Sequence, residues 1–152
     1  MPGLLMGRTN NQFLVAKTNG KIGELLTAVE LLRHGFTVSW PSVDIGYDLI
    51  SDDDKGKLSR LQVKTALPGK QGTYSVIFGH GRVVKRLYTK RDMDAFVAVL
   101  NYTDGLAFYV IPIEGILSMK GIFWQPGKHP RYPDKWRTCK YEEYRDRWDL
   151  LR

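Results

Sequence analysis

The sequence predicts an α/β or α+β domain built around a β-sheet. One helical pattern near the start is followed by several apolar runs of strand length, which Gly, Pro and Asp turns separate. The 152 residues are 43% hydrophobic and 26% charged, which is typical of a folded domain and excludes collagen-like and disordered chains. We expect residues 1–12 to form a flexible arm and residues 13–152 to form a single domain with a C-terminal helical extension.

Apolar runs and cysteine content indicate the cellular compartment in which we expect the protein. The sequence contains neither a run of about 18 apolar residues nor the apolar region of a secretion signal. Cys139 is the single cysteine and has no intramolecular disulfide partner. We therefore expect an intracellular, cytoplasmic protein that does not enter membranes.

The first expected element is an amphipathic helix over residues 21–34. Glu24 lies at the edge of its apolar face, from where a carboxylate can reach toward a sheet instead of into water. Gly35 ends the helix. The apolar face comprises Ile22, Leu25, Leu26, Ala28, Val29 and Leu32.

Six strands are expected after this helix. Residues 52–56 have turn chemistry, so the second and third strands form a hairpin. Proline and glycine interrupt the last third of the chain, and a second helix begins at about Lys140. The expected strands cover residues 36–40, 47–51, 58–66, 73–79, 95–100 and 106–111. On the second helix, an aromatic stripe that we interpret as packing onto the domain or onto a second subunit comprises Tyr141, Tyr144, Trp148 and Leu151.

Positive charge is concentrated in the middle of the chain. Lysine and arginine number 23 against 16 acidic residues, and residues 51–100, with ten basic and five acidic residues, contribute +5 of the net +7. Phosphates attract such a cluster whatever the base sequence, so the segment is either a nucleic-acid contact or a solvated basic loop. Its densest part, residues 80–91, has no acidic residue and contains Arg82, Lys85, Arg86, Lys90 and Arg91.

The alternating strand over residues 58–66 projects Gln62 and Lys64 from one face. Burying either side chain without a partner is costly, so a polar group should face them. If the hairpin turns through residues 54–56, Asp48 lies opposite Gln62 on that face, whereas a two-residue turn would shift the register by one. The cluster is then either a buried ion pair with a hydrogen-bonded amide or a metal site.

These residues, in this order on helix, strand and strand, resemble the PD-(D/E)xK nuclease superfamily. The resemblance covers residues 17–66 well and residues 95–112 more loosely, and it is strongest to the small branch that contains archaeal Holliday-junction resolvases and a cyanobacterial intron-encoded homing endonuclease. Tyr47 replaces the proline of the motif, and Gln62 replaces the aspartate or glutamate of most members, which removes a negative charge but keeps an oxygen donor. The matching segments are Gly23-Glu24, Tyr47-Asp48-Leu49-Ile50 and Gln62-Val63-Lys64.

The resemblance implies a restriction-endonuclease-like core, in which helices flank a mixed β-sheet. It also implies a magnesium-dependent endonuclease, with Mn²⁺ as a substitute. Asp48, the amide oxygen of Gln62 and the carbonyl of Val63 would bind the metal. Glu24 would bind a water on the metal or a second ion. Lys64 would orient the attacking water and stabilise negative charge on the phosphate.

The implied partner is double-stranded DNA, and we expect a homing-endonuclease-like activity because of Gln62. The alternatives are a structure-selective nuclease that resembles Holliday-junction resolvases and a catalytically inactive nucleic-acid-binding module. The inactive module leaves the convergence of Glu24 and Gln62 unexplained. A zinc site is not supported, because Cys139 and the three histidines match no zinc spacing.

Two further expectations concern contacts with DNA and with other subunits. A cut through both strands needs two active sites, so we expect a homo-oligomer, a dimer or tetramer, with the C-terminal aromatic stripe as a candidate interface. Phosphate contacts are expected from basic residues on both sides of the motif, namely Lys17, Lys21, Arg82, Lys85, Arg86, Lys90 and Arg91.

Overall fold

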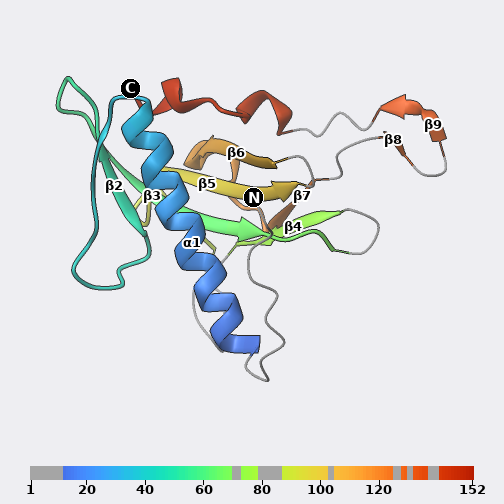
Figure 1. The fold of residues 1–152 in the computed structure, drawn as a ribbon. Helices are drawn as coiled ribbons and strands as arrows, with labels where there is room; N and C mark the ends of the chain where they lie inside the picture. Colours follow the sequence, from blue (N-terminus) through green and yellow to red (C-terminus); the bar gives the residue numbers. More distant parts are fainter. Residues whose placement is uncertain are drawn as a thin grey trace.

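The computed structural model describes residues 12–69, 73–78, 87–102, 105–124, 128–129, 132–136 and 141–152. One helix and a five-stranded sheet form its centre (Figure 1). The sheet has the strand order β1-β2-β3-β5-β6, in which β3 and β5 are parallel and the other neighbours are antiparallel. These elements are α1 (Gln12–Arg33), β1 (Thr37–Ser39), β2 (Leu49–Asp52), β3 (Leu58–Ala66), β5 (Ala95–Tyr102) and β6 (Gly105–Pro112).

Four further strands form two small ribbons. Strand β4 (Tyr74–Ile77) pairs with β7 (Gly121–Trp124), and β8 (Lys128–His129) pairs with β9 (Tyr132–Trp136). The predicted mixed α+β class is confirmed, whereas β7, β8 and β9 were not predicted. None of the described helical segments combines the length and apolar character that crossing a membrane requires.

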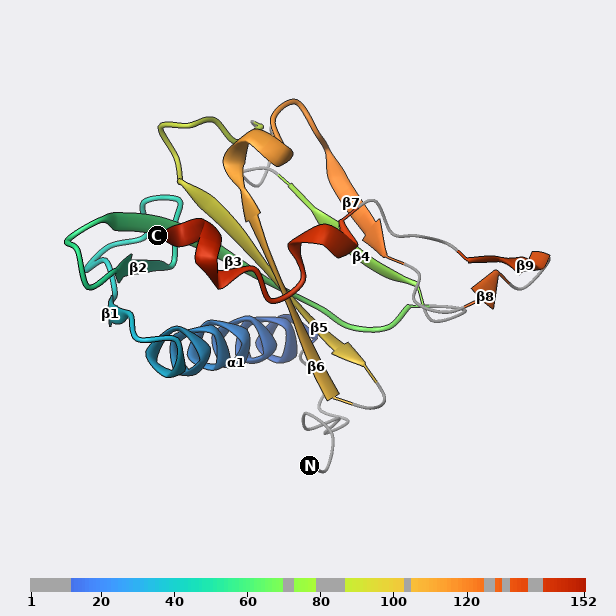
Figure 2. The ribbon, with the colours of Figure 1, turned by 90° about the horizontal axis from the view of Figure 1, so that it is seen from above.

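The main sheet separates two apolar cores. Helix α1 lies on one face of the sheet and the β4–β7 ribbon lies on the other (Figure 2). The helix-side core includes Ala28, Leu31, Leu61, Val63 and Val97. The ribbon-side core includes Tyr74, Val76, Phe96, Ile122 and Trp124. Strand β3 therefore contributes its odd-numbered residues to the helix side and turns Gln62 and Lys64 toward the other side.

Helix α1 begins at Gln12, earlier than predicted, and its buried face also differs from the prediction. Leu25, Val29 and Leu32 are exposed at 49%, 50% and 58%, although the apolar pattern predicted them to be buried. Ala28 is buried and Leu26 packs against the helix-side core, as predicted, whereas Thr27 and Leu31 are buried although the predicted face left them out. Gly23 lies on the same side. The prediction is therefore correct for part of the face and wrong for Leu25, Val29 and Leu32, because the buried face runs through Gly23, Thr27 and Leu31.

The close approach occurs where Gly23 lies over Thr65 of β3. A Cβ atom at Gly23 would collide with Oγ1 of Thr65, so the contact requires glycine. That hydroxyl donates a hydrogen bond of 3.2 Å to the carbonyl of Asn19. The contact anchors Asn19, which precedes the predicted start of the helix, on β3.

The predicted C-terminal α-helix is wrong. The structure instead has two short 3₁₀ turns, η3 (Glu142–Tyr144) and η4 (Trp148–Leu151). Between them Arg145 is extended and Asp146 has φ of 53°, which interrupts any regular helix.

The interruption lets the segment cross the edge of the sheet. Tyr141 packs into the ribbon-side core, whereas Trp148 and Leu151 pack into the helix-side core. Between these anchors, the N–H of Asp146 donates to the carbonyl of Phe108 in β6 at 2.8 Å. One straight helix cannot reach both faces. The aromatic stripe packs onto its own domain, which is one of the two arrangements that the sequence predicted.

Two glycine substitutions in α1 test the helix–sheet contact. We expect Gly20→Ala, where a Cβ has no atom within 4 Å, to stabilise the protein by up to about 1 kcal/mol through helix propensity. Gly23→Ala should instead destabilise it by about 1–3 kcal/mol, because the methyl group overpacks against Thr65. Urea unfolding of both variants measures the difference, and equal stabilisation by the two would contradict the close contact.

Candidate functional site

The turn between β2 and β3 sets the hairpin register. Oδ1 of Asp53 accepts hydrogen bonds from the backbone N–H groups of Lys55 and Lys57, each at 2.8 Å. The N–H of Asp53 donates to the carbonyl of Lys57 at 3.1 Å. Gly56 has φ of 82°, the left-handed conformation that this three-residue turn requires. The predicted turn is confirmed, and the register shifted by one residue is excluded.

This register puts Asp48 opposite Gln62 at the start of β2. Leu49 pairs with Leu61, and the N–H of Asp48 donates to the carbonyl of Leu61 at 2.8 Å. Oδ2 of Asp48 accepts a hydrogen bond of 2.8 Å from the N–H of Val63 and a second bond from Nε2 of Gln62. The predicted meeting of the carboxylate and the amide is therefore confirmed.

The amide of Gln62 presents its nitrogen to the carboxylate. Nε2 also lies 3.4 Å from the carbonyl oxygen of Val63, and the side chain is buried. Rotation of the amide group by half a turn exchanges its nitrogen and oxygen. Gln62 therefore acts as a hydrogen-bond donor in this arrangement and becomes an oxygen donor only after that rotation.

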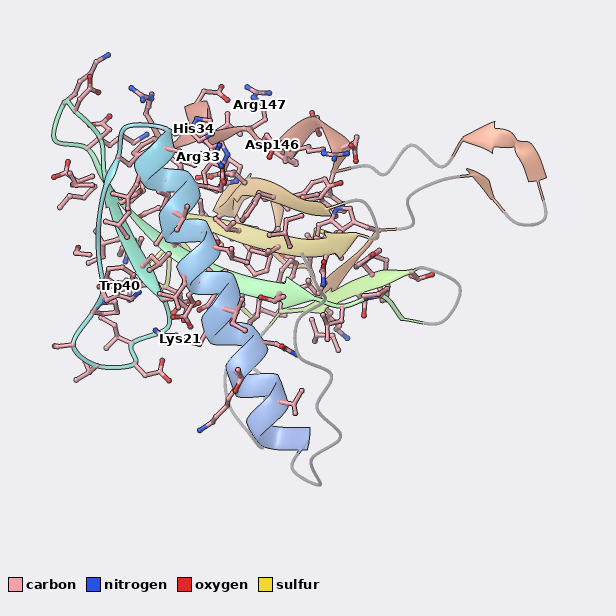
Figure 3. The ribbon with its side chains drawn as sticks, viewed as in Figure 1. Lys21, Arg33, His34, Trp40, Asp146 and Arg147 are labelled. Carbon is pink, nitrogen blue, oxygen red and sulfur yellow. The ribbon has the colours of Figure 1, made fainter. Side chains whose placement is uncertain are left out.

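A groove of about 560 Å³ lies between α1 and residues 40–48. Glu24 and Asp48 both line it, which brings the helix carboxylate and the strand carboxylate to one concave surface. Lys21 forms an ion pair with Glu24, Nζ to Oε2, at 2.5 Å. Lys21 on α1 and Trp40 in the loop after β1, both labelled in Figure 3, line this groove. The remaining lining residues are Leu25, Pro41, Ser42, Val43, Asp44 and Tyr47.

The electrostatic environment opposes the charge of Asp48. Burial raises the pKa of Asp48 to about 6, the N–H of Val63 lowers it in part, and the negative charge of Glu24 raises it further. Asp44 acts in the same direction as Glu24. A cation bound between Asp48 and Glu24 would offset both effects.

Lys64 lies two residues beyond Gln62 on β3 and acts on the same carboxylate. Its charge lowers the pKa of Asp48, although less strongly than Glu24 raises it. Lys64 is partly buried, and its ammonium group forms no ion pair or hydrogen bond with any residue that the structure describes. The direct Asp48–Lys64 ion pair that the sequence left open is therefore not formed.

The structure describes four of the seven predicted DNA-contact residues. Lys17 and Lys21 are exposed on α1, and Lys90 and Arg91 are exposed in the loop before β5. Nζ of Lys90 forms an ion pair of 2.8 Å with Oε1 of Glu114. The other three predicted contacts, Arg82, Lys85 and Arg86, lie outside the described residues.

The sequence reasoning missed the wall of the groove formed by residues 40–47. Trp40 is 46% exposed, and Asp44 and Tyr47 line the groove beside Asp48. The available signal was a loop with Pro41 and an acidic residue shortly before Asp48, since loops next to such strands commonly carry functional residues.

The oxygen atoms around Asp48 suit a hard divalent cation. Oδ1 of Asp48 accepts no hydrogen bond from the described part of the chain, and Glu24 supplies a second carboxylate to the groove. Within the described residues no three His, Cys, Asp or Glu side chains are close enough to hold a metal ion together. Two carboxylates with a backbone carbonyl suit Mg²⁺, which usually keeps several water ligands.

Comparison with known proteins agrees with this geometry. Residues 14–122 match the family model described as PD-(D/E)XK endonuclease. Among solved structures, the chain is similar to a bacterial homing endonuclease, I-Ssp6803I, with 27% sequence identity and a TM-score of 0.72 over 89% of this chain and 91% of that chain. No protein with a curated description matches significantly. Because the family match spans most of the chain, including α1 and the β2–β3 hairpin, the protein belongs to the PD-(D/E)XK endonuclease family.

Proposed function

We propose that this nuclease is a magnesium-dependent endonuclease that hydrolyses phosphodiester bonds in double-stranded DNA, as a homing endonuclease does. The observation that carries the proposal is the convergence of Glu24 and Asp48 on one groove, with the charge of Lys64 acting on Asp48. The similar solved structure is that of a bacterial homing endonuclease, which favours this substrate class.

Four groups of the chain would hold the metal. They are Oδ1 of Asp48, which accepts no hydrogen bond from the described residues, the carboxylate of Glu24, the carbonyl of Val63 and the rotated amide of Gln62. A bound divalent cation lowers the pKa of water and screens the negative charge of the phosphate. For Glu24 to take part, its ion pair with Lys21 must open, and Lys21 is then available to a DNA phosphate.

Lys64 would act directly on the reacting groups. Hydrolysis forms a bond from a water oxygen to phosphorus and breaks the bond from phosphorus to a sugar oxygen, so negative charge increases on the phosphate oxygens. An ammonium group without a carboxylate partner in the described residues can stabilise that charge and orient the water. The N–H of Val63 and the turn at Asp53 hold the Asp48 side chain in place for this role.

The Lys64→Met variant tests the chemistry. With Mg²⁺ and supercoiled, linear and four-way-junction DNA, we expect the wild type to cut duplex DNA at a defined site. Lys64→Met should bind DNA within about tenfold of the wild type and cut none of the three, because it loses charge stabilisation at the phosphate. Lys55→Met, an exposed lysine in the same hairpin, is the matched control and should cut normally.

The other outcomes separate the alternatives. Selective nicking of the junction would favour a resolvase-like enzyme, and binding without any cleavage by the wild type would favour an inactive binding module. Cleavage by Lys64→Met would contradict the role of Lys64.

The salt dependence of DNA binding tests the predicted basic footprint. If about five phosphates are contacted, log affinity should fall against log salt with a slope of about −4 to −5. Fluorescence anisotropy with a labelled duplex measures this slope. A slope near zero would rule out the proposed phosphate contacts.

Cleavage of both strands requires two active sites, so we propose that the protein forms at least a dimer. Sedimentation velocity, with and without duplex DNA, should give a mass of two or four chains. A single chain under both conditions would contradict this assembly.

Action on chromosomal DNA would place the protein in the cytoplasm, on the nucleoid.

A further inference from the structure

We propose that Arg60 is a positioning residue, which fixes the loop of residues 89–94 so that Arg91 contacts the DNA backbone next to the catalytic groove. This inference rests on the proposed function. It assigns to Arg60, on β3 between the turn and the site, a role that neither the charge pattern nor the nuclease motif indicates.

The first contact joins Arg60 to Asp94, the residue before β5. Nε and Nη2 of Arg60 donate to the two carboxylate oxygens of Asp94 at 3.0 and 2.9 Å. The backbone N–H of Arg60 donates to Oδ2 of Asp94 at 2.8 Å, and the N–H of Asp94 donates to the carbonyl of Arg60 at 2.9 Å. Two hydrogen bonds from backbone N–H groups and the planar guanidinium group of Arg60, which binds both carboxylate oxygens, therefore fix the end of the loop relative to β3.

The second contact reaches the middle of the loop. Nη1 of Arg60 donates to the carbonyl of Arg91 at 2.7 Å, and Nη2 donates to the carbonyl of Lys90 at 3.0 Å. The loop is closed by Asp92, whose Oδ2 accepts bonds from the N–H and the hydroxyl of Thr89 at 2.7 and 2.9 Å. Because Arg60 binds the carbonyl groups, it fixes the backbone from which the exposed side chains of Lys90 and Arg91 extend.

The third contact links the same arginine to the groove. The guanidinium carbon of Arg60 lies 6.0 Å from the ring centroid of Tyr47, which directly precedes Asp48. Arg60 thus connects the strand that carries Gln62 and Lys64, the residue next to Asp48 and the basic loop.

The contacts distinguish positioning from direct binding of phosphate. The guanidinium group already makes four hydrogen bonds within the chain, so it has little capacity left for a phosphate. Lys90 is held by Glu114, whereas the side chain of Arg91 is exposed. Arg91 is therefore the residue through which the loop would contact DNA.

The Asp94→Asn variant distinguishes positioning of the loop from simple charge attraction, because the two predict opposite changes in DNA affinity. It raises the net charge by one, so simple attraction predicts tighter DNA binding. Loss of the charged contact between the Arg60 guanidinium and the Asp94 carboxylate should instead loosen the loop. DNA binding should weaken roughly fivefold, and the salt slope should fall by about 1. Glu30→Gln is the matched control, because it removes the same charge from an exposed ion pair with Arg33. Arg33 lies at the end of α1 away from Lys21 (Figure 3).

The Arg60→Lys variant keeps the charge but loses the planar fork. We expect this variant to lose DNA affinity roughly fivefold, with little change in the cleavage rate at saturating DNA. The control variant Arg33→Lys should bind DNA normally. Arg91→Met should weaken binding by a similar factor. The double variant Arg60→Lys/Arg91→Met should stay near fivefold, instead of the roughly 25-fold of two independent contacts.

Normal binding by Arg60→Lys, tighter binding by Asp94→Asn or additive losses in the double variant would each overturn this inference. Hydrogen exchange without DNA should also show faster exchange of the Asp92 and Asp94 amides in Arg60→Lys at an unchanged melting temperature, and unchanged exchange would overturn the positioning role. A wild type that binds no DNA would overturn the proposed function itself.

Discussion

The register of the β2–β3 hairpin is the constraint on which the candidate site depends. A slip of one residue would turn every side chain of β3 to the opposite face and would exchange Gln62 and Lys64 with Leu61 and Val63. Leu61 is fully buried and Val63 nearly so in the helix-side core, so such a slip would expose apolar surface as well as scatter the polar cluster. The turn around Asp53 and the burial of the odd-numbered residues therefore specify the same register.

The polar cluster lies where β3 provides a backbone donor and the Asp48 carboxylate is partly buried. The N–H of Val63 stabilises the Asp48 carboxylate, while burial and the charge of Glu24 oppose it. Lys64 acts on this carboxylate without forming an ion pair with it in the described structure. The cluster thus differs from a neutralised buried ion pair. The negative charge of its carboxylates is not fully offset within the cluster, which suits a bound cation.

How far the sequence predicts this structure depends on how local each signal is. The turn at residues 54–56 and the alternation along β3 are local, so the hairpin and the Asp48–Gln62 contact could be predicted. The buried face of α1 could be predicted only in part, because it also depends on Gly23 fitting against Thr65, which is distant in sequence. The spacing of Tyr141 and Trp148 is compatible with an α-helix as well as with the observed interrupted segment. The helix is excluded only because the two side chains pack on opposite sides of the β6 edge. The groove wall and the network of Arg60 also join segments that the sequence separates.

The crossing of β6 by residues 141–152 also bears on how chains of this protein meet. The main sheet ends at β1 and β6, and an exposed strand edge offers unpaired backbone groups to the strands of other molecules. Tyr109 bridges to Arg145 and Phe108 binds the N–H of Asp146, so part of the β6 edge is occupied from within the chain. The other edge, β1, is only three residues long. Extension of the main sheet from one molecule into the next is disfavoured at both ends, which protects the fold from strand-mediated aggregation and leaves association to side-chain surfaces.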